Sequence, residues 1–516
     1  MCTKLTPLNF ILGNTKKCTS WLQIWMKNGR AFSQAAGEMP KFDYEPNQYG
    51  GLPYDKIKRI RESHLIPCFN PYYKEPLLIN EGKMQWLFDY KGKRYLDLFG
   101  GIVTISVGHC HPKVTEAATE QMKKLWHTTN IYFNSKTFEY AEKLASKFPG
   151  DLKVVYFVNS GSEANDLAVL LARLYTKNFD IISFRNSYHG LSSSCMDLTG
   201  FSVWKHNVGT TQGIHHAMNP DVYRGLWGGS QCRDSPVQTT RLCVCEQSKC
   251  NAGEMYYQQL EEIFKYSIPT GKLAALFAES IQGVGGTVQF PKGFLKKAYE
   301  LVRANGGICI ADEVQTGFGR TGEHYWGFEM HGVIPDIVTM AKGIGNGFPL
   351  AAVVTTPEIA ESLTHALHFN TFGGNPLACT IGLTVLKIIE EEKLQQNSHI
   401  VGTYFLKKLA TLRDEFECIG DVRGKGLMIG VEMVTDKETK NALPAMQSAS
   451  IREECKNLGV LLGSGGLYGN VDNRVSIVLR IKPPMCITKD DVDFAVEVLK
   501  IALQKHSGKQ SKAAKL

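Results

Sequence analysis

The chain of 516 residues lacks an uninterrupted apolar run of about 18 residues, which is the length that a membrane-spanning helix needs. Hydrophobic residues still make up 43% of the sequence and charged residues only 21%, a balance typical of globular proteins with a sizeable core. The length exceeds the roughly 150 residues of an average domain, so more than one domain fits. The sequence therefore predicts a soluble protein and excludes a bilayer-spanning one.

Paired CxxC spacing is also missing, although the chain contains 14 cysteines. Most of them lie inside apolar runs, which is typical of reduced core residues rather than of a disulfide framework. One cluster differs, because four thiols fall close together in a polar, glycine-rich stretch and could ligate zinc tetrahedrally. This cluster comprises Cys232, Cys243, Cys245 and Cys250. We expect free thiols there, with a structural zinc as the alternative, and no metal in the active site.

Acidic residues are absent before Glu38, whereas several lysines and Arg30 precede it among serine, threonine and asparagine. This composition is typical of a mitochondrial transit peptide. We therefore expect residues 1–40 to be a transit peptide and disordered N-terminus, processed near Arg30 to Ser33, and the protein to reside in the mitochondrial matrix. The C-terminal Ala514, Lys515 and Leu516 are similar to the Ser-Lys-Leu type of peroxisomal address, which makes the peroxisome the alternative.

The net charge of +8 is concentrated partly at the ends of the chain. Residues 506–516 form a basic tail, and Lys505, Lys509, Lys512 and Lys515 have no acid among them. Such a tail is typical of a solvated, frayed terminus. We expect neither nucleic acid nor a membrane as a partner.

Between about residues 101 and 375, short β-rich runs alternate with longer helical stretches, which predicts an α/β fold with a mostly parallel sheet covered on both faces. The predicted strands are Val154–Val158, Asp180–Phe184, Leu273–Ala278, Gly307–Ala311, Ile337–Met340 and Ala351–Thr355. In this architecture ligands bind at the carboxyl ends of the strands. A GxGxxG motif opening a helix after a strand is missing, which argues against a nicotinamide dehydrogenase.

The regions on either side of this large domain have a different pattern. Residues 84–98 alternate apolar and polar positions around a turn at Lys91 to Lys93, which predicts an antiparallel hairpin within an N-terminal segment, residues 41–100. Residues 376–505 combine helical stretches with strand-like Gly426 to Met433 and end in a helix from Asp490 to Leu503. We expect a smaller α+β domain here, joined by the N-terminal segment.

Three chemical groups follow three predicted strands. Ser160 and Glu163 have capping-box spacing at the start of a helix, whose exposed N–H groups could hold a phosphate. Asp312 ends a second strand, and a buried carboxylate there needs a cation such as a protonated pyridine nitrogen. Lys342 follows a third strand beside a glycine-rich loop, where desolvation could keep its amine neutral. Pyridoxal 5′-phosphate requires these three groups: a Schiff-base lysine, an acid on the ring nitrogen and a phosphate cradle.

Five ordered motifs carry a family resemblance, and together they cover most of residues 85–505: NSGSEAN, SYHG, ADEVQTGFGRTG, AKGIGNGFPLAAV and FNTFGGNP. They resemble the class III, or omega, pyridoxal-phosphate aminotransferases of fold type I. FGGIVTISVGHCHPKV and IGDVRGKGLMIGVEM are most similar to the alanine:glyoxylate branch of that family. The resemblance implies a homodimer or higher homo-oligomer that exchanges an amino group between an amino acid and a 2-oxo acid.

The resemblance also implies roles for individual residues. Lys342 binds the cofactor and moves the proton, and Asp312 keeps the pyridine nitrogen protonated. The other cofactor-binding residues implied are Gly161, Ser162, Tyr188, Val314, Gln315 and Thr371, of which Thr371 reaches the phosphate of a partner subunit.

For the substrate, the resemblance implies that Arg480 binds the α-carboxylate and that Glu279 partners an arginine. Ser280 replaces the proline that usually follows this acid. Ile102 stands where ornithine-using relatives carry tyrosine, which argues against ornithine as donor. We expect alanine or a short β-amino acid as donor and glyoxylate or pyruvate as acceptor. The alternatives are a phospholyase acting on an amino-alcohol phosphate and an omega-aminotransferase using ornithine or GABA.

Overall fold

The computed structural model describes residues 37–68, 71–209, 212–239, 241, 250–468 and 475–513. The expectations for most of the transit peptide, for Cys243 and Cys245 and for the C-terminal tripeptide lie outside these residues.

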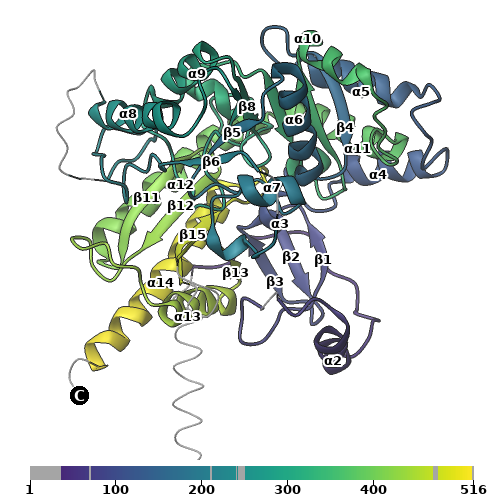
Figure 1. Cartoon of the computed structure of the whole chain (residues 1–516). Coiled ribbons are helices and arrows are strands. Elements are labelled where there is room, and N and C mark those ends of the chain that lie inside the picture. The colour runs from purple at the N-terminus through teal and green to yellow at the C-terminus, as the bar shows by residue number, and fades with distance from the viewer. Residues whose placement is uncertain are drawn as a thin grey trace, which may run out of the picture.

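A seven-stranded sheet forms the centre of the molecule (Figure 1). Its order is β4 (Val154–Val158), β10 (Ala351–Thr355), β9 (Ile337–Met340), β8 (Ile308–Asp312), β7 (Leu273–Glu279), β5 (Asp180–Phe184) and β6 (Ile214–Ala217). Only β10 runs antiparallel to its neighbours, so the predicted mostly parallel sheet is confirmed. The short β6, with two histidines among its four residues, was not predicted.

Both faces of this sheet are covered, because alternate residues of each strand pack into different cores. On β8, Ile308 and Ile310 face the core that contains α6 (Gly161–Thr176), whereas Cys309 and Ala311 face the opposite core. The α6 face also receives α7 (Ser193–Leu198) and α10 (Pro357–Glu361), and the other face receives α8 (Asn251–Tyr266) and α9 (Phe294–Ala304). The predicted α/β architecture follows from this alternation.

An N-terminal sheet lies beside the central one and joins distant parts of the chain (Figure 1). It contains β1 (Ile79–Lys83), β2 (Trp86–Asp89) and β3 (Arg94–Asp97), and β2 and β3 form the predicted antiparallel hairpin. β13 (Val460–Leu461) pairs parallel to β3, so the hairpin shares its sheet with the C-terminal part of the chain. Before this sheet comes α2 (Tyr54–His64).

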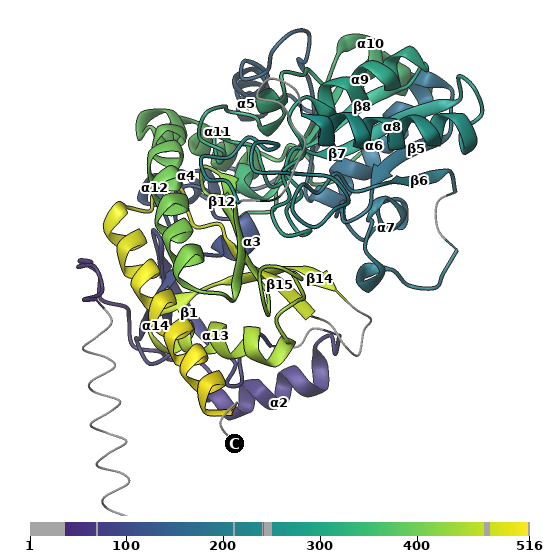
Figure 2. The same ribbon diagram turned by 90° about the vertical axis from the view of Figure 1, so that its left-hand side faces the viewer.

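The C-terminal sheet has the order β11 (Ile419–Lys425), β12 (Met428–Met433), β15 (Val475–Ile481) and β14 (Gly463–Tyr468). Around it lie α12 (Leu394–Glu415), α13 (Ala445–Asn457) and α14 (Lys489–Ala513) (Figure 2). The predicted final helix continues ten residues past Leu503, so part of the basic tail is helical. The remaining elements are α3 (Gly100–Val103), α4 (Pro112–Met122), α5 (Ser135–Ala145), α11 (Pro376–Glu391), η1 (Ser202–Trp204), η2 (Gly327–His331), η3 (Lys342–Gly345) and η4 (Ser362–His365).

A buried ion network ties the segment before α8 to the C-terminal sheet. Arg233 makes two hydrogen bonds of 2.7 Å to the carboxylate of Asp421 on β11, and Arg423 pairs with the same carboxylate at 3.0 Å. Burial alone would raise the pKa of Asp421, but the two guanidinium groups outweigh it and hold that pKa well below its usual range. Charged residues therefore face inward on β11, so this strand has no apolar pattern by which its sequence would predict it.

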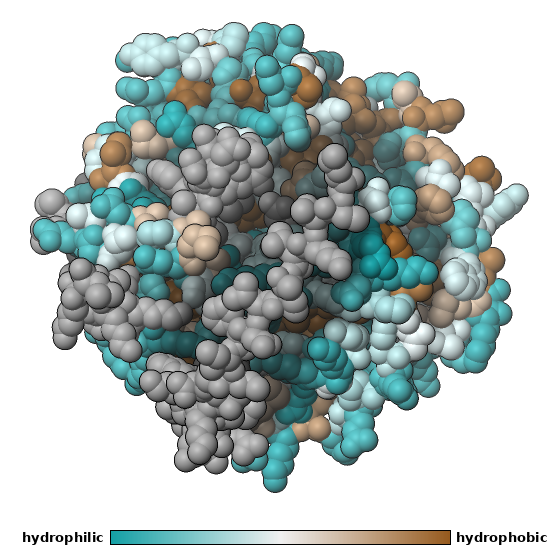
Figure 3. Space-filling model, turned by 90° about the horizontal axis from the view of Figure 1, so that it is seen from below, coloured by the Kyte–Doolittle hydropathy of each residue, from teal (hydrophilic) through white to brown (hydrophobic). Residues whose placement is uncertain are grey.

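The surface seen from below is mostly hydrophilic, with hydrophobic side chains gathered toward its upper right (Figure 3). In the part of the chain that the structure describes, no helix combines the length and the apolar character needed to span a bilayer.

Candidate active site

A cavity of about 180 Å³ lies where strands β4, β5, β7, β8 and β9 end. Its walls are Ser160, Gly161, Ser162, Asn165, Tyr188, His189, Gly190, Glu279, Asp312, Val314, Gln315 and Lys342. Carboxyl ends of parallel strands meet at one edge of a sheet, which is why residues as far apart in sequence as Ser160 and Lys342 share this space. The structure thus brings the lysine, the carboxylate and the helix start together.

Lys342 enters the cavity directly after β9, with a left-handed backbone at φ 53°. Its loop is fixed from the opposite segment, because Ser106 Oγ donates to the Gly343 carbonyl at 2.7 Å and Asn346 Oδ1 accepts from the Ser106 and Val107 N–H groups. Burial and the positive charge of Arg480 lower the pKa of Lys342 to about 8, although Asp312 and Glu279 oppose the shift. A substantial neutral fraction of the amine follows near physiological pH.

Asp312 ends β8 and is 3% exposed. Its Oδ2 accepts hydrogen bonds from His189 Nδ1 at 2.8 Å and from Asn165 Nδ2 at 3.0 Å, and its Oδ1 accepts one from the Val314 N–H at 3.1 Å. These donors replace the hydrogen bonds to water that the carboxylate loses on burial, and they fix the orientation of its oxygens. The carboxylate is thereby held ready for a cationic partner in the cavity.

The start of α6 forms another wall. Ser160 caps the helix by accepting from the Glu163 N–H, while the Glu163 carboxylate accepts from the Asn159 N–H at 2.9 Å. Within the described residues, no partner is found for the N–H groups of Gly161 and Ser162, as expected for the first turn of a helix. Unpaired N–H groups and the positive end of the helix dipole make this wall suitable for a phosphate.

Two glycines keep the space beside this helix start open. A Cβ on Gly161 would lie 3.3 Å from Val314 Cγ1, and a Cβ on Gly190 would lie 2.4 Å from Ser162 Oγ. Gly190 also has φ 118°, which other residues rarely adopt. Tyr188 stands in the wall with its ring edge-on to Trp204 at 5.4 Å. A flat ring carrying a phosphate therefore fits the donor set and the open shape of the cavity.

Arg480 does not line the cavity but lies behind Gln315, and it is 3% exposed. Its Nη2 donates to Gln315 Oε1 at 2.9 Å, and its guanidinium lies 5.4 Å from the ring centroid of Phe99. Its Nε is buried and has no partner in the described part of the chain. The guanidinium thus retains a donor for an incoming acceptor.

Among the described residues, no arginine is in ion-pair contact with Glu279, the acid for which the resemblance implies an arginine partner, although Arg480 interacts with it electrostatically. Its carboxylate accepts from the Tyr188 N–H at 3.1 Å and from the Gly283 N–H at 2.7 Å. Burial, together with the charge of Asp312, raises the pKa of Glu279. Backbone donors take the place of the guanidinium here.

Ser280, where the family usually has proline, does not loosen the turn. Its hydroxyl donates to the buried carboxylate of Glu313, which also accepts from the Gly327 and Phe328 N–H groups. A proline could not make this hydrogen bond. The hydroxyl therefore ties the end of β7 to the segment that follows β8.

Ile102 and Thr371 lie outside the cavity wall, and both are exposed. Ile102 belongs to a left-handed turn in which residues 100–103 all have positive φ, and its side chain is 41% exposed. Thr371 follows Asn370, whose Nδ2 donates to the Glu163 carboxylate at the start of α6. Both positions therefore lie near the site without closing it within one chain.

Five residues of the site that were not predicted from the sequence are Asn165, His189, Gly190, Asn346 and Lys482. Each of these residues acts through a contact with a residue far away in sequence, so the spacing of neighbouring residues does not predict its role. His189 was visible only as part of the SYHG motif.

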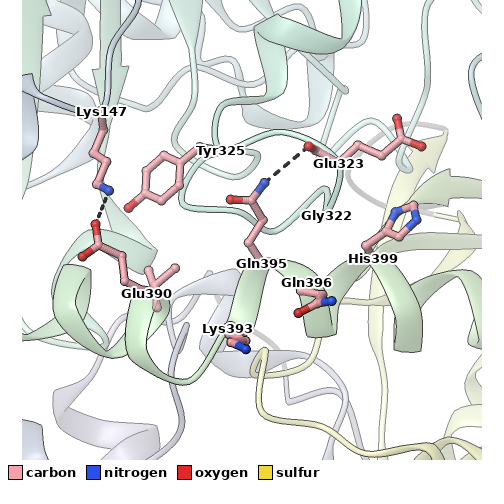
Figure 4. A pocket seen from close by; sticks show the side chains of 10 residues that line it. Lys147, Gly322, Glu323, Tyr325, Glu390, Lys393, Gln395, Gln396 and His399 are labelled. Carbon is pink, nitrogen blue, oxygen red and sulfur yellow. Dashed lines mark hydrogen bonds and ion pairs between the residues drawn. The ribbon is translucent and has the colours of Figure 1, made fainter.

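A second cavity, of about 470 Å³, opens between the α11–α12 turn and the loop at Gly322 to Tyr325 (Figure 4). Its polar groups bond to one another, as Lys147 does with Glu390 and Gln395 with the Glu323 carbonyl. None of the predicted site residues is among the described residues that line it. The chemistry therefore belongs to the smaller cavity.

Comparison with known proteins agrees with this geometry. The Aminotransferase class-III family model matches residues 69–503. The human protein named alanine–glyoxylate aminotransferase 2, mitochondrial, is 56% identical over 475 residues, which are 92% of this chain and 91% of that protein.

Two solved structures are similar throughout. An amine transaminase from an uncultivated Pseudomonas species, in its PLP-bound form, has a TM-score of 0.75 and 29% identity, covering 90% of this chain and 99% of the other. A phospholyase from Arthrobacter in complex with phosphoethanolamine has a TM-score of 0.76 and 31% identity, covering 87% of this chain and 99% of the other.

Proposed function

Because the chain belongs to the class-III aminotransferase family, we propose that it moves an amino group from alanine or a short β-amino acid to glyoxylate or pyruvate. It is a pyridoxal-phosphate-dependent enzyme of fold type I. The observation that carries the proposal is that Lys342, Asp312 and the start of α6 line one cavity. The printed name of the human relative supports the choice of alanine and glyoxylate.

The cofactor, when bound, supplies an electron-withdrawing ring that takes up the electron pair left when a substrate carbon loses its proton. Asp312 would face the ring nitrogen, since its carboxylate lines the cavity and is already oriented by His189 and Asn165. Gly161 and Ser162 would hold the phosphate, Tyr188 one ring face and Val314 the other, with Gln315 at the rim.

Lys342 would bind the cofactor and move the proton at the substrate α-carbon. A base needs a free electron pair, and the lowered pKa of about 8 gives this amine one at moderate pH. The left-handed loop held by Ser106 and Asn346 keeps its Nζ beside Asp312 in the same cavity.

Substrate choice would fall to Arg480, Glu279 and Ile102. The guanidinium of Arg480 suits a carboxylate, and its unpartnered buried Nε needs an acceptor. Ile102, exposed near the cavity, would favour short donors over ornithine, which calls for polar contacts. GABA stays an alternative donor, because an ω-amino acid presents the same carboxylate.

A homodimer is part of the proposal. Large apolar side chains are strongly exposed in two segments, among them Ile131 at 75%, Phe133 at 92% and Phe372 at 62%. The two segments are neighbours, because the ring centroids of His127 and Phe372 lie 5.6 Å apart, and Asn370 of the second segment binds Glu163 at the start of α6. Exposed apolar groups gathered in this way are typical of an interface. Thr371, exposed beside Phe372, would then contact the cofactor phosphate of the partner subunit.

The mitochondrial matrix is the proposed compartment, supported by the printed names of the human and Arabidopsis relatives. The peroxisome is the alternative that the C-terminal Ala-Lys-Leu suggests. Two fusions of the full-length protein, one with a fluorescent protein at the N-terminus and one with it at the C-terminus, distinguish the two compartments by where the fluorescence is found.

A phospholyase is the second candidate activity, because one similar structure carries that name and holds phosphoethanolamine. Elimination of phosphate could use the same Lys342 and Asp312. Purified protein loaded with pyridoxal phosphate separates the two activities. We expect L-alanine to remove the visible absorbance of the bound cofactor and glyoxylate to restore it. Phosphate release from phosphoethanolamine, without a change of absorbance on addition of alanine, would contradict the transaminase activity and support the phospholyase activity.

A further inference from the structure

Lys482 is a fully buried lysine two residues beyond Arg480, where β15 has just ended. Its Nζ lies 3.3 Å from the Gly283 carbonyl oxygen and 3.3 Å from Gln315 Oε1. In the part of the chain that the structure describes, no carboxylate forms an ion pair with it. A buried lysine without an ion-pair partner lowers the stability of the fold, whether it stays charged or gives up its proton, so stability does not explain a lysine at this position.

Two nitrogen donors converge on one oxygen atom. Gln315 Oε1 accepts from Arg480 Nη2 at 2.9 Å and from Lys482 Nζ. An amide accepts at its oxygen and donates at its nitrogen, and the reverse orientation would set an NH₂ group against two donors. These two donors therefore hold the oxygen of Gln315 on the side of Arg480 and Lys482, which do not line the cavity, and the nitrogen is left to donate into it.

The charged groups around Lys482 are mostly of its own sign. Arg480, Lys342 and Arg320 disfavour its protonation, whereas Glu279 favours it. Burial is the largest cause, and together these groups lower the pKa of Lys482 well below its usual value. Lys342 in turn faces Arg480, Asp312 and Glu279. The amine of Lys482 can donate to Gln315 in either protonation state, so the contact does not depend on its charge.

We propose that Lys482 is a positioning residue that, with Arg480, directs the amide nitrogen of Gln315 into the cavity beside Lys342 and so lowers the pH at which the cofactor-bound nitrogen of Lys342 loses its proton. The proposal rests on cofactor binding at Lys342. An N–H donor there would stabilise negative charge on an oxygen of the bound cofactor, and an oxygen so stabilised would compete less strongly for the proton of that nitrogen.

The test is a pH titration of the visible absorbance of the holoenzyme, without substrate. Lys482→Met is expected to raise the midpoint by about one pH unit. Gln315→Met should raise it in the same direction, and the double variant should add little to either single change, because both act through one amide. Lys482→Arg, which retains a cationic donor, should stay close to wild type.

Lys425→Met is the matched control, since Lys425 is also buried but pairs with Asp234 and Glu323 rather than with Gln315. It should lower the Tm and leave the midpoint unchanged. If Lys482→Met does not fold, Lys482→Gln supplies the measurement, with a smaller rise expected. The proposal is overturned if the folded Lys482 variant titrates with the wild-type midpoint, or if the shifts of Lys482→Met and Gln315→Met simply add. If the wild-type protein never acquires the visible absorbance of the bound cofactor, the result would instead contradict the proposed function.

Discussion

At the scale of single residues, burial sets the chemistry of Lys342. An exposed lysine would be charged at neutral pH, but burial and Arg480 lower the pKa of this one to about 8. The same desolvation that supplies a neutral amine also costs stability while the amine is protonated. Catalytic competence and stability therefore oppose each other at this position.

For the cofactor-free protein, we expect Lys342→Met to raise the Tm by a few degrees at pH 7. The folded pKa of about 8 is lower than the unfolded value, so the unfolded state binds more protons between pH 8 and about 10.5 and wild-type stability rises with pH in that window. The advantage of the variant should accordingly shrink as pH rises from 8 to 10. Thermal unfolding of both proteins as a function of pH measures it. A variant less stable than wild type at pH 7 would contradict the expected desolvation cost.

At the scale of elements, the helix start of α6 depends on a glycine in another segment. Gly190 follows β5, yet the space that its missing side chain leaves is filled by Ser162 in the first turn of α6. The local sequence SYHG gives no sign of this contact. Phosphate binding at a helix start is thus a property of two elements rather than of one.

We expect Gly190→Ala to weaken cofactor binding about tenfold or more, because its Cβ would lie 2.4 Å from Ser162 Oγ and displace the first turn of the helix. Titration of the apoenzyme with pyridoxal phosphate measures the Kd. Gly332→Ala is the control, since Gly332 also has positive φ but nothing within 4 Å of the added Cβ. Equal effects of the two variants on the Kd would show that backbone strain alone is responsible.

At the scale of the whole molecule, charged contacts join parts that are far apart in sequence. Arg233 precedes α8, and its partner Asp421 lies on β11 of the C-terminal sheet. The pKa of Asp421 lies well below its usual range, so this carboxylate contributes stability above about pH 4 and loses it as the pH falls.

Arg233→Met should lower the free energy of unfolding by about 3–5 kcal/mol at pH 7, because it leaves a buried carboxylate short of a partner. The difference from wild type should narrow as the pH falls below about 4. Urea unfolding at several pH values measures it. Lys408→Met is the control: its ion pair with Asp493 is exposed and should be worth less than about 1 kcal/mol. If the free energy of unfolding falls no more for Arg233→Met than for the control, the buried pair has no structural role.

The exposed apolar side chains predict an assembly larger than one chain. Phe133, 92% exposed, should be covered by a second copy, so Phe133→Asp should shift the protein toward monomer and reduce cofactor retention. Sedimentation velocity and bound-cofactor absorbance provide the two readouts. Met446→Asp, 77% exposed on α13, should change neither. Sedimentation of the wild-type protein as a monomer would contradict the proposed dimer.

The sequence by itself determined the central sheet except for β6, and it determined the chemical groups at the edge of that sheet. Apolar runs such as Ile337–Met340 are long and pure enough to be recognised as strands, and Asp312 and Lys342 follow such runs directly. Position at a strand end then predicts which edge they share, because parallel strands place their carboxyl ends together. Neither inference needs a contact between distant residues.

Only the tertiary structure decided what surrounds those groups. β11 went unpredicted because its charged residues are buried in ion pairs with Arg233 and other distant partners, which an apolar pattern cannot show. The backbone donors to Glu279, the His189 and Asn165 bonds to Asp312, and the convergence of Arg480 and Lys482 on Gln315 likewise depend on chain segments that meet only in the fold. Burial and charge at these meeting points, rather than residue type alone, set the proton affinity of Lys342.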